Sequence, residues 1–337
     1  MATEDSTTPT RVPAVAVVVP AYRVEDYVVD TLRSVQRQTM PDWECVVVED
    51  GSPDDTAARV AEIAVDDARI RLVRQANTGL SGARNTGLAH VSEGVRYVAF
   101  LDSDDLWRED ALEHLLAALE ADPAAVGAYG YAEFVDEHGE PFASGLHSGR
   151  QRQRRRLVGR LVRPVAEHEP VRFDELVVGN PVWPPAVALH RREVVDEVGP
   201  FDTTLKQCED VDFMLRMARH GPYVATARQV AWYRQHGGQM TTRRAEFWYA
   251  HDMVRRKSWE SELNTPEQRR DVARAWRVAQ VRRLVRCSLR LGSAVRHGRW
   301  PDARRLAHGW AVLVVQLIGS VPPVARLEHV HLAGRDV

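Results

Sequence analysis

Two aspartates, Asp102 and Asp104, follow directly after the apolar stretch 97–101. Carboxylates two residues apart at the end of a strand can hold a hard divalent cation, leaving its other positions to water and phosphate. Taken alone, such a pair is weak evidence, because aspartates at these positions more often cap the following helix. Asp50, which comes shortly after the apolar stretch 45–48, strengthens the case. A carboxylate at a neighbouring strand end can accept a hydrogen bond from a base N–H or a ribose hydroxyl.

The first hundred residues alternate between two hydrophobic periods. Short β-branched apolar runs are typical of strands buried on both faces of a parallel sheet, and the segments between them carry apolar residues at helical spacing. This alternation with short connections predicts a doubly wound α/β sheet. The predicted strands are 14–19, 44–48, 70–74 and 97–101, and the predicted helices between them begin near residues 25, 52 and 82.

Unusual polar or turn residues follow each predicted strand: Pro20-Ala21-Tyr22, Glu49-Asp50, Asn77, and Asp102 to Asp105. In open α/β sheets, ligands bind at the carboxyl ends of the strands. Polar loops and helix caps would explain any one of these segments, but four in register favour a ligand-binding edge. Neither G-x-G-x-x-G nor G-x-x-x-x-G-K-[ST] is present, so the two common phosphate-binding loops are not predicted.

Five segments resemble motifs of the family 2 inverting glycosyltransferases, in the family's order and approximate spacing. They are VAVVVPAYRVEDYVVDTLRSVQRQTMPDWECVVVEDGSPDDT (15–56), NTGLSGARNTGL (77–88), YVAFLDSDDLW (97–107), FDTTLKQCEDVDFMLR (201–216) and WYRQHGGQMT (232–241). The resemblance covers roughly residues 14–242. It implies a GT-A-type fold, in which a mostly parallel, nucleotide-binding sheet is flanked by helices.

The resemblance also implies roles for residues on the donor side. Mn²⁺ or Mg²⁺ would be the cofactor, with Asp104 as the main protein ligand and Asp102 contacting the ribose or the metal. Glu49 stands where the family often has an aspartate, and the retained Asp50 makes this departure tolerable. The remaining donor-side residues would be Pro20 and Tyr22 beside the base, Asp50 at the base or ribose, and Arg84 with Asn85 reaching the base or phosphates.

On the acceptor side, the resemblance implies that Asp210, in the pair Glu209-Asp210, is the general base. His236 would meet the diphosphate or complete the metal shell. The residues alone leave other interpretations open, because Asp210 suits the first turn of a helix and His236 suits an ordinary loop. Trp183 could offer an aromatic platform to a sugar ring, or it could belong to a rigid packing turn. Glu209 would position the acceptor or the helix.

These implied roles describe an enzyme that transfers a sugar from a nucleotide diphosphate to an acceptor hydroxyl by a single, inverting displacement. A metal-dependent nucleotidyltransferase and a non-catalytic protein that binds nucleotide sugars or glycans are the alternatives. A nucleotidyltransferase would not need a base as remote as Asp210, which argues against the first alternative. A degenerate binding protein could have lost the D-x-D or Glu209-Asp210, so the presence of both argues against the second. Processive synthesis is disfavoured because the Q-x-x-R-W signature is missing.

Charge is distributed unevenly along the chain of 337 residues. Residues 1–253 carry 28 Lys and Arg against 40 Asp and Glu, whereas residues 254–308 carry 15 against 5. The basic segment could meet a phosphorylated acceptor or an anionic membrane surface, although solvated helix faces are commoner. Nucleic acid is not an expected partner, because interleaved aromatic residues and known motifs are missing.

The order of these patterns predicts four regions. They are a disordered leader (1–13), a nucleotide-sugar subdomain (14–125), an acceptor-side subdomain (126–244) and a helical C-terminal extension (245–337). The polar N-terminus has no apolar core of a signal peptide, and the three cysteines are widely spaced. We therefore expect a cytoplasmic protein, with peripheral contact at the inner face of the membrane as a further expectation. Its partners would be the nucleotide-sugar donor and a glycan, lipid-linked or small-molecule acceptor.

Overall fold

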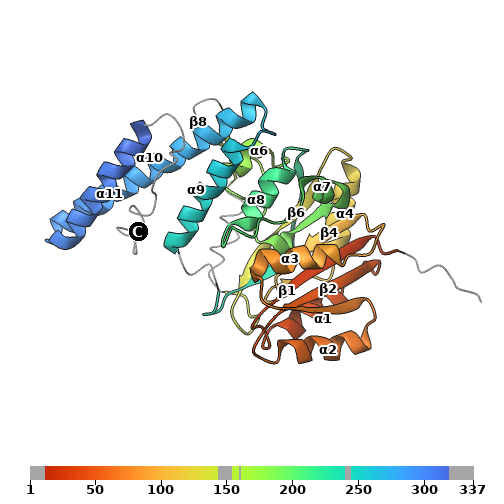
Figure 1. Ribbon diagram of the computed structural model, residues 1–337. Coiled ribbons are helices and arrows are strands. Elements are labelled where there is room, and N and C mark those ends of the chain that lie inside the picture. The colour runs from red at the N-terminus through yellow and green to blue at the C-terminus, as the bar shows by residue number, and fades with distance from the viewer. Residues whose placement is uncertain (1–11, 143–153, 159–160, 240–243, 319–337) are drawn as a thin grey trace, which may run out of the picture.

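The protein is described by a computed structural model that covers residues 12–142, 154–158, 161–239 and 244–318. An eight-stranded sheet forms its centre, with the strand order β3-β2-β1-β4-β9-β6-β10-β5, and a separate hairpin pairs β7 with β8 (Figure 1). The predicted leader, as far as residue 11, the end of the segment 232–241 and residues 319–337 of the predicted C-terminal extension lie outside the described residues.

The first half of the sheet is parallel, as the hydrophobic pattern predicted. Its strands are β1 (Val15–Ala21), β2 (Trp43–Asp50), β3 (Ile70–Gln75) and β4 (Tyr97–Phe100). Every residue of β1 and β2 is buried, because the sheet is covered on both faces. The helices between these strands are α1 (Val28–Gln36), α2 (Thr56–Asp66) and α3 (Gly79–Ala89).

Helix α3 packs closely on the sheet. A Cβ atom added at Gly87 would come within 2.3 Å of Val18 Cγ1 on β1, so a larger residue at this position would push the helix away. This close approach holds the N-terminus of α3, and the Arg84 side chain that follows it, against the carboxyl ends of the central strands.

The second half of the sheet continues from β4 without a break. Strand β9 (Ala188–Arg191) lies antiparallel between β4 and β6 (Gly127–Val135), and β10 (Tyr223–Arg234) runs parallel to β6. The short β5 (Leu106–Trp107) pairs antiparallel with β10. One mostly parallel sheet therefore runs through both subdomains predicted from the sequence, which confirms the α/β fold class. Smaller elements here are α4 (Ala111–Ala121), β7 (Arg155–Val158), β8 (Leu161–Pro164), α6 (Phe173–Leu176), η1 (Pro185–Val187), α7 (Arg192–Val198) and α8 (Glu209–Met217).

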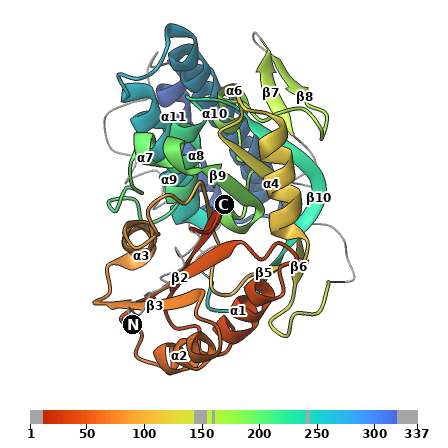
Figure 2. The same ribbon diagram turned by 90° about the vertical axis from the view of Figure 1, so that its right-hand side faces the viewer.

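Three helices follow the sheet: α9 (Arg244–Glu260), α10 (Pro266–Arg296) and α11 (Trp300–Ile318). Helix α9 lies beside α8, and α10 and α11 form an antiparallel hairpin that extends away from the sheet (Figures 1 and 2). A capping box starts α10, in which the Thr265 side chain accepts from Gln268 N and the Gln268 side chain accepts from Thr265 N. Within the described ranges, no helix combines the length and the apolar composition needed to span a bilayer.

Candidate active site

The residues singled out in the sequence gather at one edge of the sheet. Strands β1, β2, β4, β6 and β10 all point in the same direction, so their carboxyl ends meet there. Asp50 ends β2, the Asp102–Asp104 segment follows β4, and His236 follows β10. Arg84 reaches this edge from α3, and Asp210 reaches it from α8.

Asp50 binds the N-terminus of α3. Its Oδ1 accepts from Thr78 N at 2.8 Å and from Gln75 Nε2 at 2.7 Å, and its Oδ2 accepts from Gly79 N at 2.9 Å. The side chain is buried, and the helix dipole favours an anion at this position. Asp50 therefore fixes the loop between β3 and α3, and Oδ2 retains a lone pair for a further donor.

Arg84 links the donor-side aspartate to the acceptor-side motif. Its Nη2 donates to Asp102 Oδ1 at 2.7 Å and its Nη1 donates to Glu209 Oε1 at 2.6 Å. The guanidinium is 1% exposed, so it exchanges water for these two carboxylates. Burial opposes its charge, but Asp102 and Glu209 outweigh that effect and raise the pKa of Arg84. Burial also raises the pKa of Asp102, while Arg84 opposes the rise.

Asp210 has the electrostatic environment of a proton acceptor. Loss of hydration raises its pKa to about 7, the neighbouring charge of Glu209 adds to the rise, and Arg84 opposes it. Such a carboxylate binds a proton more strongly than an ordinary aspartate and remains half ionised near neutral pH. Asp212, two residues further along α8, differs because its Oδ2 pairs with Arg216 at 3.0 Å and with Lys257 at 2.9 Å.

An aromatic cluster sets the position of α8 beside the end of β4. Phe100, the last residue of β4, meets Phe201 edge to face with ring centroids 4.9 Å apart. Phe201 stacks on Phe213 at 4.4 Å, and Phe213 lies one turn after Asp210. Because Phe100 precedes Asp102 by two residues, this packing fixes the donor-side aspartate and the base helix relative to each other.

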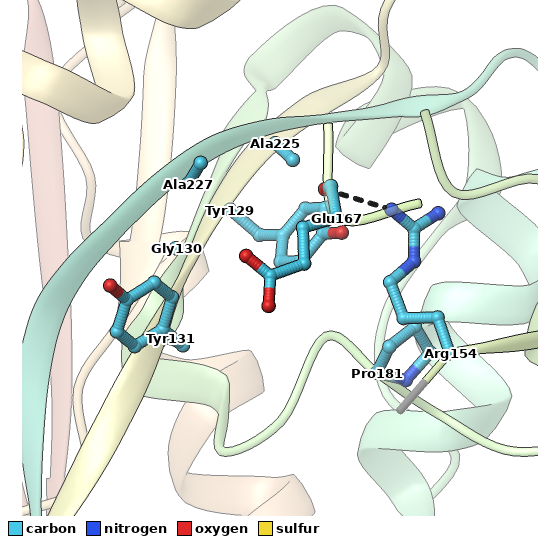
Figure 3. A pocket seen from close by; sticks show the side chains of 8 residues that line it. All are labelled: Tyr129, Gly130, Tyr131, Arg154, Glu167, Pro181, Ala225 and Ala227. Carbon is cyan, nitrogen blue, oxygen red and sulfur yellow. Dashed lines mark hydrogen bonds between the residues drawn. The ribbon is translucent and has the colours of Figure 1, made fainter. Parts of the chain in front are cut away.

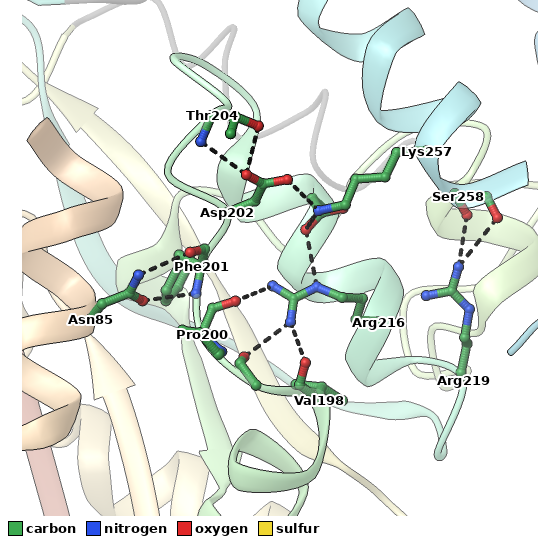
Figure 4. Close-up of polar contacts among 12 residues, drawn as sticks. Asn85, Val198, Pro200, Phe201, Asp202, Thr204, Arg216, Arg219, Lys257 and Ser258 are labelled. Atoms are coloured by element: carbon green, nitrogen blue, oxygen red, sulfur yellow. Dashed lines mark hydrogen bonds and ion pairs between the residues drawn. The ribbon is translucent and has the colours of Figure 1, made fainter. Parts of the chain in front are cut away.

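The loop that leads into α8 is held on two sides (Figure 4). On one side, Asn85 Nδ2 donates to Phe201 O at 2.9 Å, and Phe201 N donates to Asn85 Oδ1 at 2.8 Å. The nitrogen and the oxygen of the Asn85 side-chain amide thus both contact the acceptor-side loop, and this residue connects α3 to that loop. On the other side, Lys257 Nζ of α9 contacts Asp202 Oδ2 at 2.7 Å and Asp212 Oδ2 at 2.9 Å.

Asp104 and His236 form the other contact at the sheet edge. His236 Nε2 lies 3.0 Å from Asp104 Oδ2, and Gly238 N donates to His236 Nδ1 at 3.3 Å. With Nδ1 as an acceptor, the ring hydrogen sits on Nε2 and is donated to Asp104; a cation bound by both groups would replace it. Carboxylate oxygen and imidazole nitrogen suit Mn²⁺, and one or two carboxylates plus substrate phosphates suit Mg²⁺. The donor set therefore fits the implied cofactor.

In the described part of the chain, no three His, Cys, Asp or Glu side chains are grouped so that they could hold a metal ion. Asp102 contacts Arg84, whereas Asp104 contacts His236. A cation at this edge would consequently need oxygen atoms from a bound ligand to complete its shell, and a diphosphate supplies such atoms.

Arg234 is a site residue that the sequence interpretation missed. Its guanidinium is buried, and it donates to Asp104 O at 3.0 Å and to Glu137 O at 2.7 Å. Its backbone N–H donates to Asp105 Oδ1 at 3.1 Å. Arg234 thus fastens the loop after β4 to the end of β10. Its position two residues before His236, inside the motif 232–241, was the available signal.

The other expected residues lie around this edge in different surroundings. Pro20 is buried in β1, and Tyr22 just beyond it is 41% exposed, so the tyrosine is accessible to a ligand. Trp183 packs with its ring centroid 4.8 Å from that of Tyr233 and 6.2 Å from that of Phe134. Because Phe134 and Tyr233 lie near the carboxyl ends of β6 and β10, the half-buried Trp183 belongs to the same edge.

Comparison with known proteins identifies the first half of the chain. Residues 16–166 match the model of glycosyl transferase family 2. They form a family 2 glycosyltransferase domain.

Two curated relatives and one solved structure extend this result. The uncharacterized glycosyltransferase EpsJ of Bacillus subtilis is 30% identical over 63% of this chain and 58% of its own length. The UDP-Glc:alpha-D-GlcNAc-diphosphoundecaprenol beta-1,3-glucosyltransferase WfgD of Escherichia coli is 40% identical over 29% of this chain and 38% of its own. The chain thus spans less than two thirds of the length of either relative.

The solved structure is the mannosyltransferase PcManGT of Pyrobaculum calidifontis, in complex with GDP-Man and Mn²⁺. It covers 92% of this chain and 88% of its own, with a TM-score of 0.57 and 19% identity. At this identity the likeness establishes the fold alone, which is the GT-A-type fold that the sequence motifs implied.

The match to the family 2 domain ends before Glu209, Asp210 and His236, so the association of these residues with it rests on the contacts described above. A small pocket elsewhere on the molecule is lined by residues of β6 and β10 and of the segments near Arg154 and Pro181 (Figure 3). None of the site residues predicted from the sequence lines it.

Proposed function

We propose that this chain transfers a sugar from a nucleotide-diphosphate donor to an acceptor hydroxyl, with inversion at the anomeric carbon and without processivity. The observation that carries the proposal is the link through Arg84, whose guanidinium contacts both Asp102 and Glu209. This link brings the donor-side D-x-D segment of the family 2 domain next to a carboxylate with a strongly raised pKa, Asp210. A donor-binding edge and a base in one network are what single displacement requires.

In the proposed reaction, Asp210 accepts the proton of the acceptor hydroxyl as its oxygen attacks the anomeric carbon. A new carbon–oxygen bond forms on one face of the sugar while the bond to the β-phosphate oxygen breaks on the other, and the nucleoside diphosphate leaves. Asp104, His236 and Asp102 are proposed to hold Mn²⁺ or Mg²⁺. When bound, such a cation neutralises negative charge on a diphosphate.

Several residues would bind the donor. Tyr22, which is exposed beyond β1, is proposed to cover the base together with Pro20. Asp50 fixes the loop before α3 and keeps a lone pair for the base or ribose. The side chains of Arg84 and Asn85 are already hydrogen-bonded to other residues of the protein, Arg84 to Asp102 and Asn85 to the backbone of Phe201. We therefore propose that they act on the donor by positioning Asp102 and the acceptor-side loop.

The acceptor is proposed to bind between Asp210 and the aromatic cluster of Trp183, Phe134 and Tyr233, since aromatic rings stack on the apolar faces of sugars. A lipid-linked glycan is the acceptor class that the relative WfgD suggests by its name. The three cysteines are buried and form no disulfide, which suits a reducing, cytoplasmic location. Contact with the inner face of a membrane is a separate proposal that rests on the C-terminal helices.

The proposal is tested in two stages. Thermal unfolding is first measured with a panel of nucleotide sugars, with Mn²⁺ or with EDTA, because a ligand that binds the folded state raises the melting temperature. We expect one donor class to stabilise the protein in a metal-dependent way. The anomeric configuration of the product is then determined by NMR. Stabilisation by no nucleotide sugar, or a product with retained configuration, would contradict the proposal.

A further inference from the structure

The hairpin of α10 and α11 carries an uncovered apolar stripe. Val281, Val285 and Leu289 follow one another at intervals of four residues, so they lie along one face of α10. They are 46%, 53% and 70% exposed, and the exposed fraction increases toward the end of the hairpin farther from the sheet. Buried residues of the same helix, such as Trp276 and Cys287, lie on the opposite side. The stripe is therefore not part of the core that holds α10 in place.

A tryptophan of α11 extends this stripe. Trp310 is 40% exposed, and its indole Nε1 donates to Ser288 Oγ at 2.9 Å. Ser288 follows Val285 by three residues and so adjoins it on the helix surface. A tryptophan with its N–H bonded and its ring partly exposed is the side chain most often found where apolar and aqueous surroundings meet.

The charge around the stripe is almost entirely positive. From residue 277 to residue 311 the sequence holds nine arginines and one acidic residue, Asp302. Asp302 pairs with Arg299 and Arg305, and Arg283 pairs with Asp252 of α9. Arg282 and Arg296 form no ion pair within the described part of the chain. They stand seven residues before and after Leu289, so they share the face that it exposes.

A second positive element reinforces this face. Burial, the charge of Arg155 on β7 and the charge of Arg286 together lower the pKa of Arg282. Arginines brought close together repel one another, and an anionic surface relieves that repulsion. The same charge disfavours a second copy of this chain as the occupant of the stripe, because two such hairpins would place like charges face to face.

We propose that the α10–α11 hairpin binds the surface of an anionic lipid bilayer, with Val281, Val285, Leu289 and Trp310 inserted at the headgroup level and Arg282 and Arg296 beside the phosphates. An amphipathic helix with arginines next to an apolar stripe binds such surfaces by combining buried apolar area with charge attraction. Helix α9 joins the hairpin to the sheet, and its Lys257 contacts the base helix α8 through Asp212. Docking would thus hold the proposed active site near lipid-linked molecules.

The proposal is tested by sedimentation of the full-length protein with vesicles of phosphatidylcholine alone or with about one third phosphatidylglycerol. We expect binding to the anionic vesicles at low salt, weaker binding at high salt, and little binding to the neutral vesicles. The double variant Arg282→Gln/Arg296→Gln should lower partitioning by roughly tenfold or more, since each basic residue near an anionic leaflet contributes about fivefold. Val285→Ser/Leu289→Ser should lower it by about tenfold as well, because inserted apolar groups are lost.

The matched control is Arg59→Gln/Val65→Ser, which makes the same kinds of change on the exposed face of α2 and should bind vesicles like the wild type. All variants should keep the wild-type circular dichroism spectrum and melting temperature. Neither measurement involves a sugar donor, so failure of the sugar-transfer proposal does not affect this test. Equal binding by the wild type and both hairpin variants, or no binding at low salt, would overturn the proposal. Loss in the arginine variant alone would indicate a general polyanion surface, and a change from dimer to monomer in the stripe variant would indicate a second copy.

Discussion

Helices α3 and α8 both direct their N-termini at the same sheet edge, and each has a carboxylate there, but the two carboxylates differ in their surroundings. Asp50 at α3 accepts hydrogen bonds from Thr78 N and Gly79 N and from the Gln75 side chain. Asp210 in the first turn of α8 stands next to Glu209, and burial together with that charge raises its pKa to about 7. The first carboxylate stabilises a loop, whereas the second is prepared to accept a proton. The helix dipole alone does not decide the role of a carboxylate; the number of its donors and charged neighbours does.

The sharpest test of this contrast is Asp210→Asn. The variant keeps the size of the side chain but cannot accept a proton, so we expect sugar transfer to fall by roughly 10²–10⁴-fold. Donor affinity should stay within about threefold, since a base acts mainly in the transition state. Steady-state transfer rates and calorimetric donor binding would be compared, with the milder Glu209→Gln as the control. Near-normal turnover of Asp210→Asn would show that Asp210 is not the general base. Asp212 is a poor candidate to replace it, because Asp212 already pairs with Arg216 and Lys257.

The donor side of the comparison is tested by Asp104→Ala. We expect this variant to lose the metal-dependent part of nucleotide-diphosphate binding, because Asp104 and His236 supply the proposed protein ligands. Calorimetry with and without EDTA measures that part. Asp66→Ala, at the exposed end of α2, is the matched control and should bind like the wild type. Undiminished binding that is still sensitive to EDTA would place the metal elsewhere.

Arg84→Met removes the cation that joins the two sides. Asp102 and Glu209 would then lack their shared partner in a buried site, and breaking such a pair costs about 3–5 kcal/mol. We expect the melting temperature to drop by on the order of 10 °C and transfer to fall more than donor affinity. Arg84→Lys should recover part of the stability but little of the transfer, because one ammonium group cannot bridge both carboxylates in the same geometry. An Arg84→Met variant with the melting temperature of the wild type would contradict the proposal that Arg84 joins Asp102 to Glu209.

The pH dependence of transfer gives a further check on Asp210. A general base works only when it is deprotonated, so kcat/KM should fall about tenfold per pH unit below its pKa and level off above it. With the pKa of Asp210 raised to about 7, the bend is expected near neutral pH. Transfer rates from pH 5.5 to 8.5 locate this bend. In the Asp210→Asn variant, the residual activity should no longer fall with decreasing pH in this range. A bend near pH 4 would show that Asp210 behaves as an ordinary carboxylate.

The smallest effect is expected from Lys257→Met, which loosens α8 without touching either carboxylate at the edge. Burial opposes ionisation of Asp202, but its hydrogen bonds to Lys257 and Thr204 lower its pKa to about 2, so the ion pair is formed at neutral pH. We expect kcat to fall by a few fold, at unchanged donor affinity, with recovery in Lys257→Arg. Lys206→Met is the matched control, because Lys206 is exposed and is the only other lysine in the sequence. A lower donor affinity in Lys257→Met would show that the contact does not act through α8 alone.

The donor edge could be predicted from sequence because its parts are local. Strands β2 and β4 contain apolar runs, and each candidate aspartate lies at or just after the end of its strand. The parallel arrangement alone therefore brings Asp50, Asp102 and Asp104 to one edge. The α/β class and the approximate positions of the first four strands are confirmed for the same reason. The subdomain boundaries, the roles of the site residues and the metal stay predictions.

The sequence by itself determined the alternation of strands and helices, the D-x-D segment, the Glu209-Asp210 pair and the excess of arginine after residue 253. Only the tertiary structure decided which of these residues meet. Arg84 pairs with Glu209 across 125 positions of the chain, and Arg234 fastens the loop of Asp104 across 130. Such contacts depend on sheet order and helix packing, which local periodicity does not encode. The structure also separated the buried face of α10 from its exposed stripe, since neighbouring helices, and not the arginines themselves, determine which side is covered.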